Sequence, residues 1–426
     1  MRFNQWAWGL GLATAALMSA CGGGGSDSKA QMRLLNASIG YPSLDMAVDS
    51  TTVNSAVTYA NVGSYADINT GATGTEVQSN SVGSTLASTT PSLASGSHYT
   101  MIAYGAAGSV RTTLLQEDQE VPASGKSKLL ILNLAPDAGA LDVYVTGTTD
   151  SLDGASTSAS AISAGSGSGY LTFNSGTLRV RLTASGNKSD LRLDIPSITL
   201  PSAGVSTLVL TGSSGGVLVN GIQLIQQGAT TNFLNSTARA RLVAAVGGNA
   251  LVAGSIGSTQ LLPASTAPTI GDYQTLATGS TAPTIFVNGV QLPVSSFPTL
   301  TAGGDYTLMV WGPATSPQLT VLTDDNKLPT TSSAAKIRLI NGVANTTAGL
   351  TLNVDYSALA SNVLAGTSST PTTTAATTSS LLTVNSPASA TPIYSLSSLA
   401  IQANGVYTVF VMGDNTSMVG SLRKER

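Results

Sequence analysis

Hydrophobic and polar residues alternate over short stretches of this chain, a pattern that predicts β-strands. Residues 178–183 and 191–195 place an apolar side chain at every second position, the period that buries one face of a sheet and leaves the other in water. Ser185 to Lys188 between them predicts a turn, and Asn220-Gly221 and Asn288-Gly289, each flanked by apolar residues, predict hairpins. Because no segment after residue 30 keeps a helical period over three turns, we expect an all-β fold.

Two runs of residues recur four times along the chain and indicate repeats. An apolar run opens each repeat at Arg33, Leu130, Arg241 and Arg338, and a run ending in glycine closes it at 99–105, 206–212, 306–312 and 407–413. Between them lie inner runs at 44–48, 141–145 and 350–354 and middle strands that start at 63–65, 169–170 and 271–273. About a hundred residues per repeat is the size of one small domain. We therefore expect tandem Ig-like or transthyretin-like β-sandwich domains at 31–126, 127–237, 238–335 and 336–426.

Segments rich in Ser, Thr, Ala and Gly interrupt the repeats at 70–92, 148–169, 255–283 and 357–392. Such sequence buries little apolar area and does not offset the entropy of ordering it, so we expect long mobile loops at one end of each sandwich. Linkers between domains are expected at 119–127, 227–237 and 327–335.

The second repeat shows the most specific pattern of the four. Residues 132–138, LNLAPDA, lead into residues 141–145, LDVYV. Together with the R-L-x-N opening, the G-x-Y middle strand and the closing G-x-x-Y-T-x-x-x-x-G, this resembles the bacterial family of domains of unknown function numbered 4397. The resemblance spans residues 31–230, and repeats three and four are more divergent. It implies an Ig-like or transthyretin-like sandwich on exported proteins, and it implies no catalytic residues because the family has no assigned activity.

The N-terminus has the layout of a secretory signal peptide over residues 1–20, with Arg2 followed by an apolar stretch and small residues. Residues 17–21 resemble the bacterial lipobox, which implies cleavage before Cys21 and acylation of its thiol. Cys21 is the single cysteine in the chain, which excludes an internal disulfide. Residues 21–30 then form a Gly/Ser-rich tether. In the Gram-negative lipoproteins that this N-terminus resembles, an Asp directly after the cysteine retains the protein at the inner membrane. Gly22 therefore predicts a lipid-anchored protein of the outer membrane.

Composition and charge narrow the classes of function. Hydrophobic residues make up 42% of the chain, enough to build folded cores, while charged residues make up only 9%. The net charge of −3 and the lack of a basic patch exclude a nucleic-acid partner.

Candidate catalytic groups are few. His98 is the single histidine, so a histidine-based zinc site is excluded, and we interpret it as an outer-face strand residue. Ser185 and Lys188 match S-x-x-K, but a Gly-Asn turn between them destroys the helical spacing that this chemistry needs. The glycine-rich residues 165–169 precede a strand instead of a helix N-terminus, so they do not form a phosphate loop. We predict no catalytic residue and no cofactor.

Charged residues suggest two weaker sites. Carboxylates at the ends of repeats are hard ligands of the kind calcium prefers, and the candidates are Glu117, Asp118, Asp324 and Asp325. Exposed polar turns explain these four equally well. Charges on the hairpin of repeat two are expected to pair across strands on one solvent-facing surface, with an anionic ligand as the alternative: Arg179, Arg181, Asp190, Arg192 and Asp194. Arg423 to Arg426 is expected to be a solvated tail.

These observations favour a non-enzymatic cell-envelope lipoprotein that displays β-sandwiches for a structural or protein-interaction role. Its partners would be the membrane, through acylated Cys21, and an envelope protein or glycan. The alternative is a binding module for an extracellular glycan or polymer, with sugar rings stacked on exposed Tyr144, Tyr170, Tyr273 and Trp311. A hydrolase would need two acids facing each other across a cleft.

Overall fold

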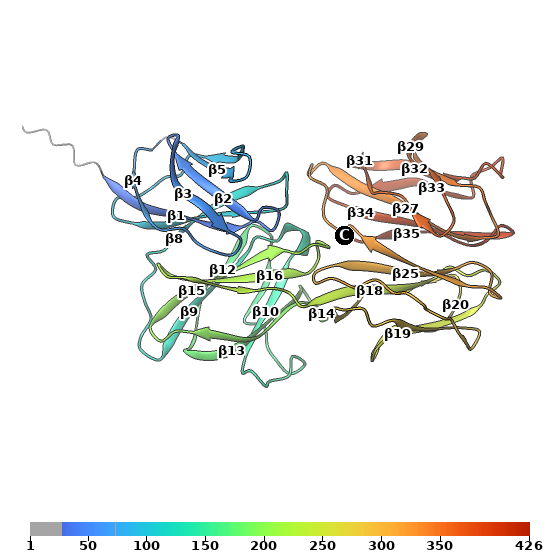
Figure 1. Ribbon diagram of the computed structural model, residues 1–426, viewed down its shortest axis with the longest axis horizontal. Coiled ribbons are helices and arrows are strands. Elements are labelled where there is room, and N and C mark those ends of the chain that lie inside the picture. The colour runs from blue at the N-terminus through green and yellow to red at the C-terminus, as the bar shows by residue number, and fades with distance from the viewer. Residues whose placement is uncertain (1–27, 73) are drawn as a thin grey trace, which may run out of the picture.

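The computed structural model describes residues 28–72 and 74–426, and Cys21 lies outside this range. Within it the chain forms four β-sandwiches, each built from two antiparallel or mixed sheets (Figure 1). The one helical element described is a 3₁₀ turn, η1 (Pro136–Ala138). The prediction of an all-β fold with tandem sandwiches is therefore confirmed.

Domain 1 has sheets of order β4-β1-β7-β8 and β3-β2-β5-β6. Its strands are β1 (Lys29–Ala37), β2 (Ser43–Val48), β3 (Thr51–Thr58), β4 (Ala66–Asn69), β5 (Thr75–Ser79), β6 (Thr85–Thr89), β7 (His98–Tyr104) and β8 (Arg111–Gln116).

Domain 2 has sheets of order β12-β9-β15-β16-β17 and β11-β10-β13-β14. Its strands are β9 (Lys126–Asn133), β10 (Leu141–Thr146), β11 (Ala159–Ile162), β12 (Ser166–Asn174), β13 (Gly176–Ala184), β14 (Asn187–Leu200), β15 (Gly204–Gly212), β16 (Val219–Ile225) and β17 (Thr230–Phe233). Because β17 pairs with β16, the expected linker at 227–237 is partly a strand of this domain.

Domain 3 has sheets of order β21-β18-β25-β26, with β22 also on β18, and β20-β19-β23-β24. Its strands are β18 (Thr237–Ala244), β19 (Leu251–Ile256), β20 (Thr259–Thr266), β21 (Thr269–Ile270), β22 (Gln274–Ala277), β23 (Pro283–Val287), β24 (Val290–Gln291), β25 (Asp305–Trp311) and β26 (Gln318–Asp324).

Domain 4 has sheets of order β30-β27-β34-β35, with β31 also on β27, and β29-β28-β32-β33. Its strands are β27 (Ala334–Ala344), β28 (Leu350–Val354), β29 (Ser357–Val363), β30 (Thr367–Ser368), β31 (Thr372–Ala375), β32 (Thr377–Asn385), β33 (Tyr394–Ile401), β34 (Val406–Asp414) and β35 (Ser417–Lys424).

The opening and closing runs of each repeat are strands, as the sequence predicts, and in every domain the two pair in parallel. The pairs are β1 with β7, β9 with β15, β18 with β25 and β27 with β34. We call the sheet that contains this pair the inner sheet of its domain and the other the outer sheet. The sequence gives no sign of this pairing because the two strands lie far apart along the chain.

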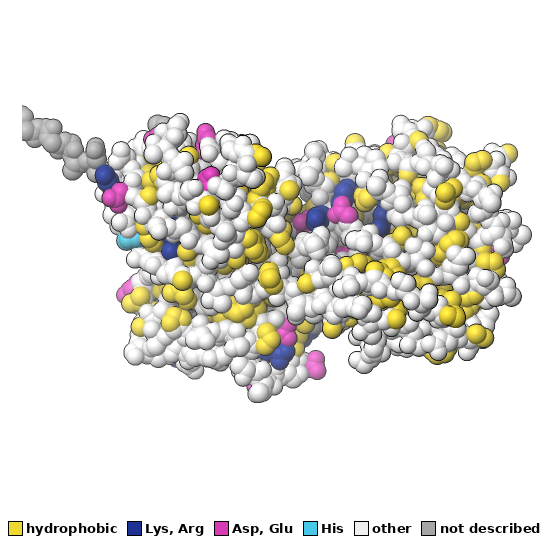
Figure 2. Space-filling model, viewed as in Figure 1, with side chains coloured by type: hydrophobic (Ala, Val, Ile, Leu, Met, Phe, Trp, Pro, Cys, Tyr) yellow, Lys and Arg dark blue, Asp and Glu magenta, His cyan; other side chains and the backbone are white. Residues whose placement is uncertain are grey.

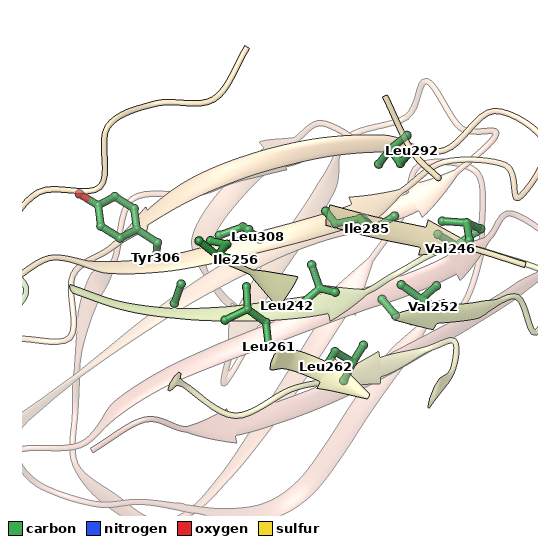
Figure 3. Packing of buried hydrophobic residues seen from close by; sticks show 14 of the residues in the cluster. Leu242, Val246, Val252, Ile256, Leu261, Leu262, Ile285, Leu292, Tyr306 and Leu308 are labelled. Atoms are coloured by element: carbon green, nitrogen blue, oxygen red, sulfur yellow. The ribbon is translucent and has the colours of Figure 1, made fainter. Parts of the chain in front are cut away.

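Each domain has its own apolar core between its two sheets. In domain 3 the side chains of Leu242, Ile285 and Leu308 meet in the space between the strands (Figure 3). Alternate residues of each strand supply these contacts, as expected for a sandwich with one buried face per sheet.

Two further apolar clusters lie between domains. Inner-sheet residues of domains 1 and 2 meet in one of them, which includes Leu35, Ile102 and Val209. The other joins domains 3 and 4 and includes Met309 and Phe410. Inner sheets are therefore buried on both faces, which explains why the opening runs are continuously apolar instead of alternating. The four domains form two stacked pairs, with the outer sheets on the outside (Figure 1).

The expectation of long loops in the low-complexity segments is wrong except at residues 148–158 of domain 2, which contain no strand. These segments contain β5, β6, most of β11 to β12, β20 to β22 and β29 to β32. Buried apolar side chains at inward positions hold these stretches, for example Val77, Ile162 and Leu382. Thr is β-branched and suits a half-buried pleated surface, so few apolar residues are enough to order these strands.

The two Asn-Gly signals have different outcomes. Asn288 and Gly289 connect β23 to β24 with φ of 50° and 79°, as a two-residue hairpin requires. Asn220 and Gly221 instead lie inside β16, so this hairpin prediction is wrong. A Cβ on Gly221 would lie 3.1 Å from Leu208 Cδ1, and Asn220 Oδ1 accepts a hydrogen bond from Asn235 N at 2.8 Å. Close packing, not a turn, accounts for the glycine here.

Candidate functional site

Buried charged groups lie where domains meet, and the first set joins domains 1 and 2. Arg33 on β1 pairs with Glu117 at 3.0 Å, and both side chains are at most 5% exposed. Tyr65 donates to the same carboxylate at 2.9 Å, and its ring lies 4.5 Å from the Arg33 guanidinium. Domain 2 completes the set through Gln227 N, which donates to Glu117 at 2.6 Å, and Gly228 O, which accepts from Arg33 at 2.7 Å.

The second set joins domains 3 and 4 and is reciprocal. Arg241 of domain 3 binds both oxygens of Glu425 in domain 4, at 3.0 and 2.7 Å. Arg338 of domain 4 lies 2.7 Å from Asp324 in domain 3. Two cations thus face two carboxylates, with each partner supplied by the other domain. Such exchange follows when equivalent faces of two similar domains pack against each other.

Tyr273 occupies the same place in the second set that Tyr65 occupies in the first. Its hydroxyl donates to Asp324 at 2.6 Å, and its ring lies 4.4 Å from the Arg241 guanidinium. Burial, and after it the charge of Asp324, raises the pKa of Tyr273 well above its ordinary value. The phenol therefore remains a protonated donor that bonds to the Asp324 carboxylate.

A third set lies where domains 2, 3 and 4 meet. Arg239 forms two bonds with Asp305 at 2.9 and 2.6 Å, and Asp137 of domain 2 accepts from Leu328 N at 2.7 Å. Burial raises the pKa of Asp137 above its ordinary value. Burial, and next the charges of Arg192 and Arg239, lower the pKa of Arg426 to about 10. Figure 2 shows Lys, Arg, Asp and Glu side chains gathered near the C-terminal end of the chain, on a face that is otherwise largely uncharged.

The solvated tail that the sequence suggested is wrong for Glu425 and Arg426, which are covered, whereas Arg423 and Lys424 are exposed. The side chain of Glu425 is 6% exposed in its pair with Arg241, and Arg423 donates to Ile270 O of domain 3 at 3.1 Å. The alternation of β35 directs these side chains across the interface between domains, which the sequence alone does not reveal.

The residues that carry the repeat pattern are structural. Asn133 donates to Gly139 O and Ile162 O at 3.0 and 2.9 Å and accepts from Ala135 N at 3.1 Å. Asn36 and Asn341 make corresponding bonds. Buried polar groups of this kind are hydrogen-bonded to fix backbone that would otherwise be unsatisfied.

The Leu-Asp pair and the closing-strand Tyr have similar tasks. Asp142 accepts from Ala161 N, where φ is +52°, at 2.7 Å, and from Gly186 N at 2.8 Å. Asp45 accepts from Ala56 N in the same way. Closing-strand hydroxyls accept from backbone N–H groups five residues earlier, a tyrosine corner typical of Ig-like sandwiches: Tyr99, Tyr306 and Tyr407.

The four carboxylates proposed for calcium each lie against a cationic or ionisable partner. Glu117 and Asp324 are held in the ion pairs described above, and Asp325 binds Lys336 at 2.7 Å. Asp118 lies 3.0 Å from His98 Nδ1. Among the residues the structure describes, no three His, Cys, Asp or Glu side chains gather as a metal site would require.

Several expectations about exposed side chains are wrong. Tyr144 is 2% exposed, and Tyr170, Tyr273 and Trp311 are half-buried, so none is a free platform for a sugar ring. The expected solvent-facing hairpin surface contains the pair Arg179 and Asp194, but Arg181 and Arg192 are buried. Arg181 is bonded to Asp150 O in the connection 147–158, and Arg192 lies where domain 2 meets domain 3.

The remaining candidates lie apart from one another. His98 begins β7, its ring 5.4 Å from that of Tyr65 in an edge-on contact. Ser185 lies in the turn between β13 and β14 and Lys188 on β14, so S-x-x-K is a hairpin, as predicted. Two hollows, about 430 Å³ along residues 53–64 and 350 Å³ along residues 158–171, have no titratable side chain in their lining. No helix in the described range is long and apolar enough to cross a bilayer.

Sequence reasoning missed the arginines that join the domains. Arg33, Arg241 and Arg338 stand at the same position of three opening runs. A charge repeated beside a continuously apolar run was the available signal, because such a strand is buried on both faces and its charge then needs a partner.

Comparisons with known proteins give the following findings. The family model described as "Domain of unknown function (DUF4397)" matches residues 30–144 and 238–348, more than half of the chain. The first match covers domain 1 and the start of domain 2, and the second covers domain 3 and the start of domain 4. The matches therefore include repeat three, which is more divergent in sequence, but only the start of repeat two. No curated protein matches the chain.

Three solved structures show low similarity. A candidate cell adhesion protein from Bacteroides uniformis is 13% identical over 48% of this chain and 100% of its own, with a TM-score of 0.23. A second, from Parabacteroides distasonis, is 11% identical over 71% of this chain and 99% of its own, with a TM-score of 0.17. The Bacillus anthracis TIE protein is 10% identical over 91% of this chain and 68% of its own, with a TM-score of 0.15. TM-scores this low carry no argument about function.

Proposed function

Because this chain belongs to the DUF4397 family, whose description assigns no activity, we propose that it is a non-enzymatic protein of the bacterial cell envelope. In this proposal Cys21 carries lipid, the Gly/Ser tether spaces the folded part from the outer membrane, and the tandem sandwiches serve binding or structure. The lipid anchor and the location rest on the N-terminal sequence alone.

The observation that carries the non-enzymatic proposal is the use made of the ionisable groups. The buried pairs, such as Arg33 with Glu117 and Arg241 with Glu425, lie between domains, and their side chains are bonded to one another. The inner sheets are buried against each other in the two apolar clusters between domains. The outer sheets, apart from the part of β14 around Arg192, remain for contact with other molecules, as on other scaffolds that carry function on their surface.

The anchor is tested by metabolic labelling with a fatty-acid analogue. The unmodified protein should take up label, and Cys21→Ala should take up none, because the thiol is the acylated atom. Ser26→Ala in the tether is the matched control and should label normally. Label in Cys21→Ala, or none in the unmodified protein, would refute the anchor.

The location is tested separately by membrane fractionation. The unmodified protein should sediment with the outer membrane, whereas Gly22→Asp should move it to the inner membrane. An unchanged distribution for Gly22→Asp would contradict the proposed sorting signal and leave the labelling result unaffected.

A further inference from the structure

The outer sheet of domain 2 differs from the other three outer sheets in two respects. Its strands carry Lys or Arg at 179, 181, 188 and 192, whereas no strand of the other outer sheets carries either residue. The connection after the first outer-sheet strand has two residues in domains 1, 3 and 4, at 49–50, 257–258 and 355–356, but twelve in domain 2, at 147–158. Figure 1 places this sheet, with β10, β13 and β14, on the side of domain 2 away from domain 1.

The long connection, residues 147–158, lies over this sheet, and we call it the strap. Arg181 donates to Asp150 O at 2.9 Å, and Lys188 donates to Asp153 O and Ala155 O at 2.9 and 2.7 Å. Tyr144 stands opposite Arg181 in the strand register, is 2% exposed, and has its ring 5.5 Å from Lys188 Nζ. We call Tyr144, Arg181 and Lys188 the covered face.

The two cations of the covered face have no counter-ion. Within residues 28–72 and 74–426 neither Arg181 nor Lys188 forms an ion pair. Asp194 stands opposite Arg181 in the strand register, but its carboxylate binds Arg179 at 2.8 Å. Arg181 is 4% exposed, and its Nε–H has no hydrogen-bond partner. A buried guanidinium satisfied only in part is costly.

The other acids near the covered face do not supply the missing charge. The Asp142 carboxylate is bonded to the backbone N–H groups of Ala161 and Gly186. Asp150 Oδ2 accepts from Gly147 N at 2.8 Å inside the strap itself. The neutral carbonyl oxygens of the strap therefore occupy donors that would bind a carboxylate more strongly, since charge-assisted bonds are roughly twice as strong.

The strap is held by polar bonds and buries little of itself. None of its twelve residues is buried, and Leu152 and Ala155, its apolar members, are half-buried. Segments with few buried apolar contacts open at low cost in free energy. Opening the strap would expose an aromatic ring beside two uncompensated cations.

We propose that the covered face is a binding site for an acidic saccharide, and that the strap covers it until the ligand displaces it. The Tyr144 ring supplies an apolar surface for a sugar ring, and Arg181 and Lys188 bind its carboxylates. This inference rests on the proposed binding role but not on the lipid anchor, so labelling of Cys21 and saccharide binding fail or succeed separately.

The test uses the full chain in detergent with hexagalacturonate as the probe, measured by calorimetry. Replacing residues 148–155 with Asn-Gly, the turn found at Asn288 and Gly289, removes the cover and should tighten binding about tenfold, because the competing conformation is lost. In that background Lys188→Gln should weaken binding about fivefold through the lost charged bond. Lys126→Gln, a lysine on the inner sheet bonded to Asn174, is the matched control and should change nothing.

A second measurement covers the case in which the shortened chain does not fold. Hexagalacturonate added to the unmodified protein should speed hydrogen exchange at Asp150 and Ala155 N–H, whose bonds lie within the strap. Lack of binding by a shortened protein that melts cooperatively would overturn the proposal. So would equal binding of neutral maltohexaose, equal binding of poly-glutamate, or binding to the unmodified protein without a change in strap exchange.

Discussion

Replacing Glu425 with glutamine should destabilise domains 3 and 4 far more than the loss of one surface charge. The Glu425 and Arg241 side chains are 6% and 3% exposed and share two short bonds. Glu425→Gln leaves the Arg241 guanidinium buried without the carboxylate that it binds. Removing one partner of a buried pair costs about 3–5 kcal/mol. Arg338 adds to this cost, because both guanidinium groups would then share the single carboxylate of Asp324.

Thermal unfolding followed by circular dichroism measures this effect in the full chain. For about 150–250 residues, each kcal/mol shifts the midpoint by about 2–4 °C, so the transition of domains 3 and 4 should fall by about 6 °C or more. Among the described residues, none in domains 1 and 2 is bonded to Glu425, so these domains should unfold as before. Glu120→Gln removes an exposed carboxylate and serves as the control, with a change below about 0.5 kcal/mol.

The double variant Arg241→Gln with Glu425→Gln separates the pair from its surroundings. Residues in one buried network are coupled, so the double variant should cost less than the sum of the two single variants. The reasoning would be refuted if Glu425→Gln melted like Glu120→Gln, or if the two single effects were additive.

Two further predictions concern the domain pairs and the repeat pattern. Residues 28–124 alone should self-associate in light scattering, because Leu35 and Ile102 are no longer covered by domain 2. Residues 28–236 should stay monomeric. A monomeric protein of residues 28–124 would contradict the apolar cluster between the domains. Burial raises the pKa of Asp142, but the N–H groups of Gly186 and Ala161 outweigh it and hold this pKa below its usual value. Asp142→Ala should therefore lower the free energy of unfolding by about 1–3 kcal/mol at pH 7, measured by urea unfolding. The difference in this free energy between the two proteins should shrink as the pH falls from about 4 through the lowered pKa. An unchanged difference at about pH 2.5 would refute this.

Strands could be predicted from the sequence where a single local pattern determines them. Alternation placed the hairpin of β13 and β14, and the repeated runs placed the opening and closing strands. Their parallel pairing was not accessible, since Gln31 and His98 meet across a whole domain and no local pattern records such a partner. The Thr-rich strands were predicted as loops from their composition, although buried apolar residues such as Leu382 are enough to order them.

Charged residues were the hardest to place from the sequence. Glu117 and Asp324 were recognised as a group at the ends of repeats, yet their partners are arginines on opening strands, and for Asp324 the partner is in another domain. A carboxylate beside a linker has the same sequence whether it faces water, calcium or a guanidinium. Only the packing of whole domains decides among these environments, and that packing depends on apolar residues far from either charge.

The parallel pairing of β1 with β7 has a mechanical consequence. A pull on the N-terminus, directed along β1, stretches the ladder between Gln31 and Ala37 in shear, so that its hydrogen bonds resist the force together instead of opening one by one. The inner sheet is also clamped by domain 2, so sliding β1 out would disturb two cores at once. Resistance to such a pull depends on the rate of unfolding and not on the equilibrium stability alone. Under the proposed lipid anchor, the first strand would be a secure point of attachment for the folded part of the protein.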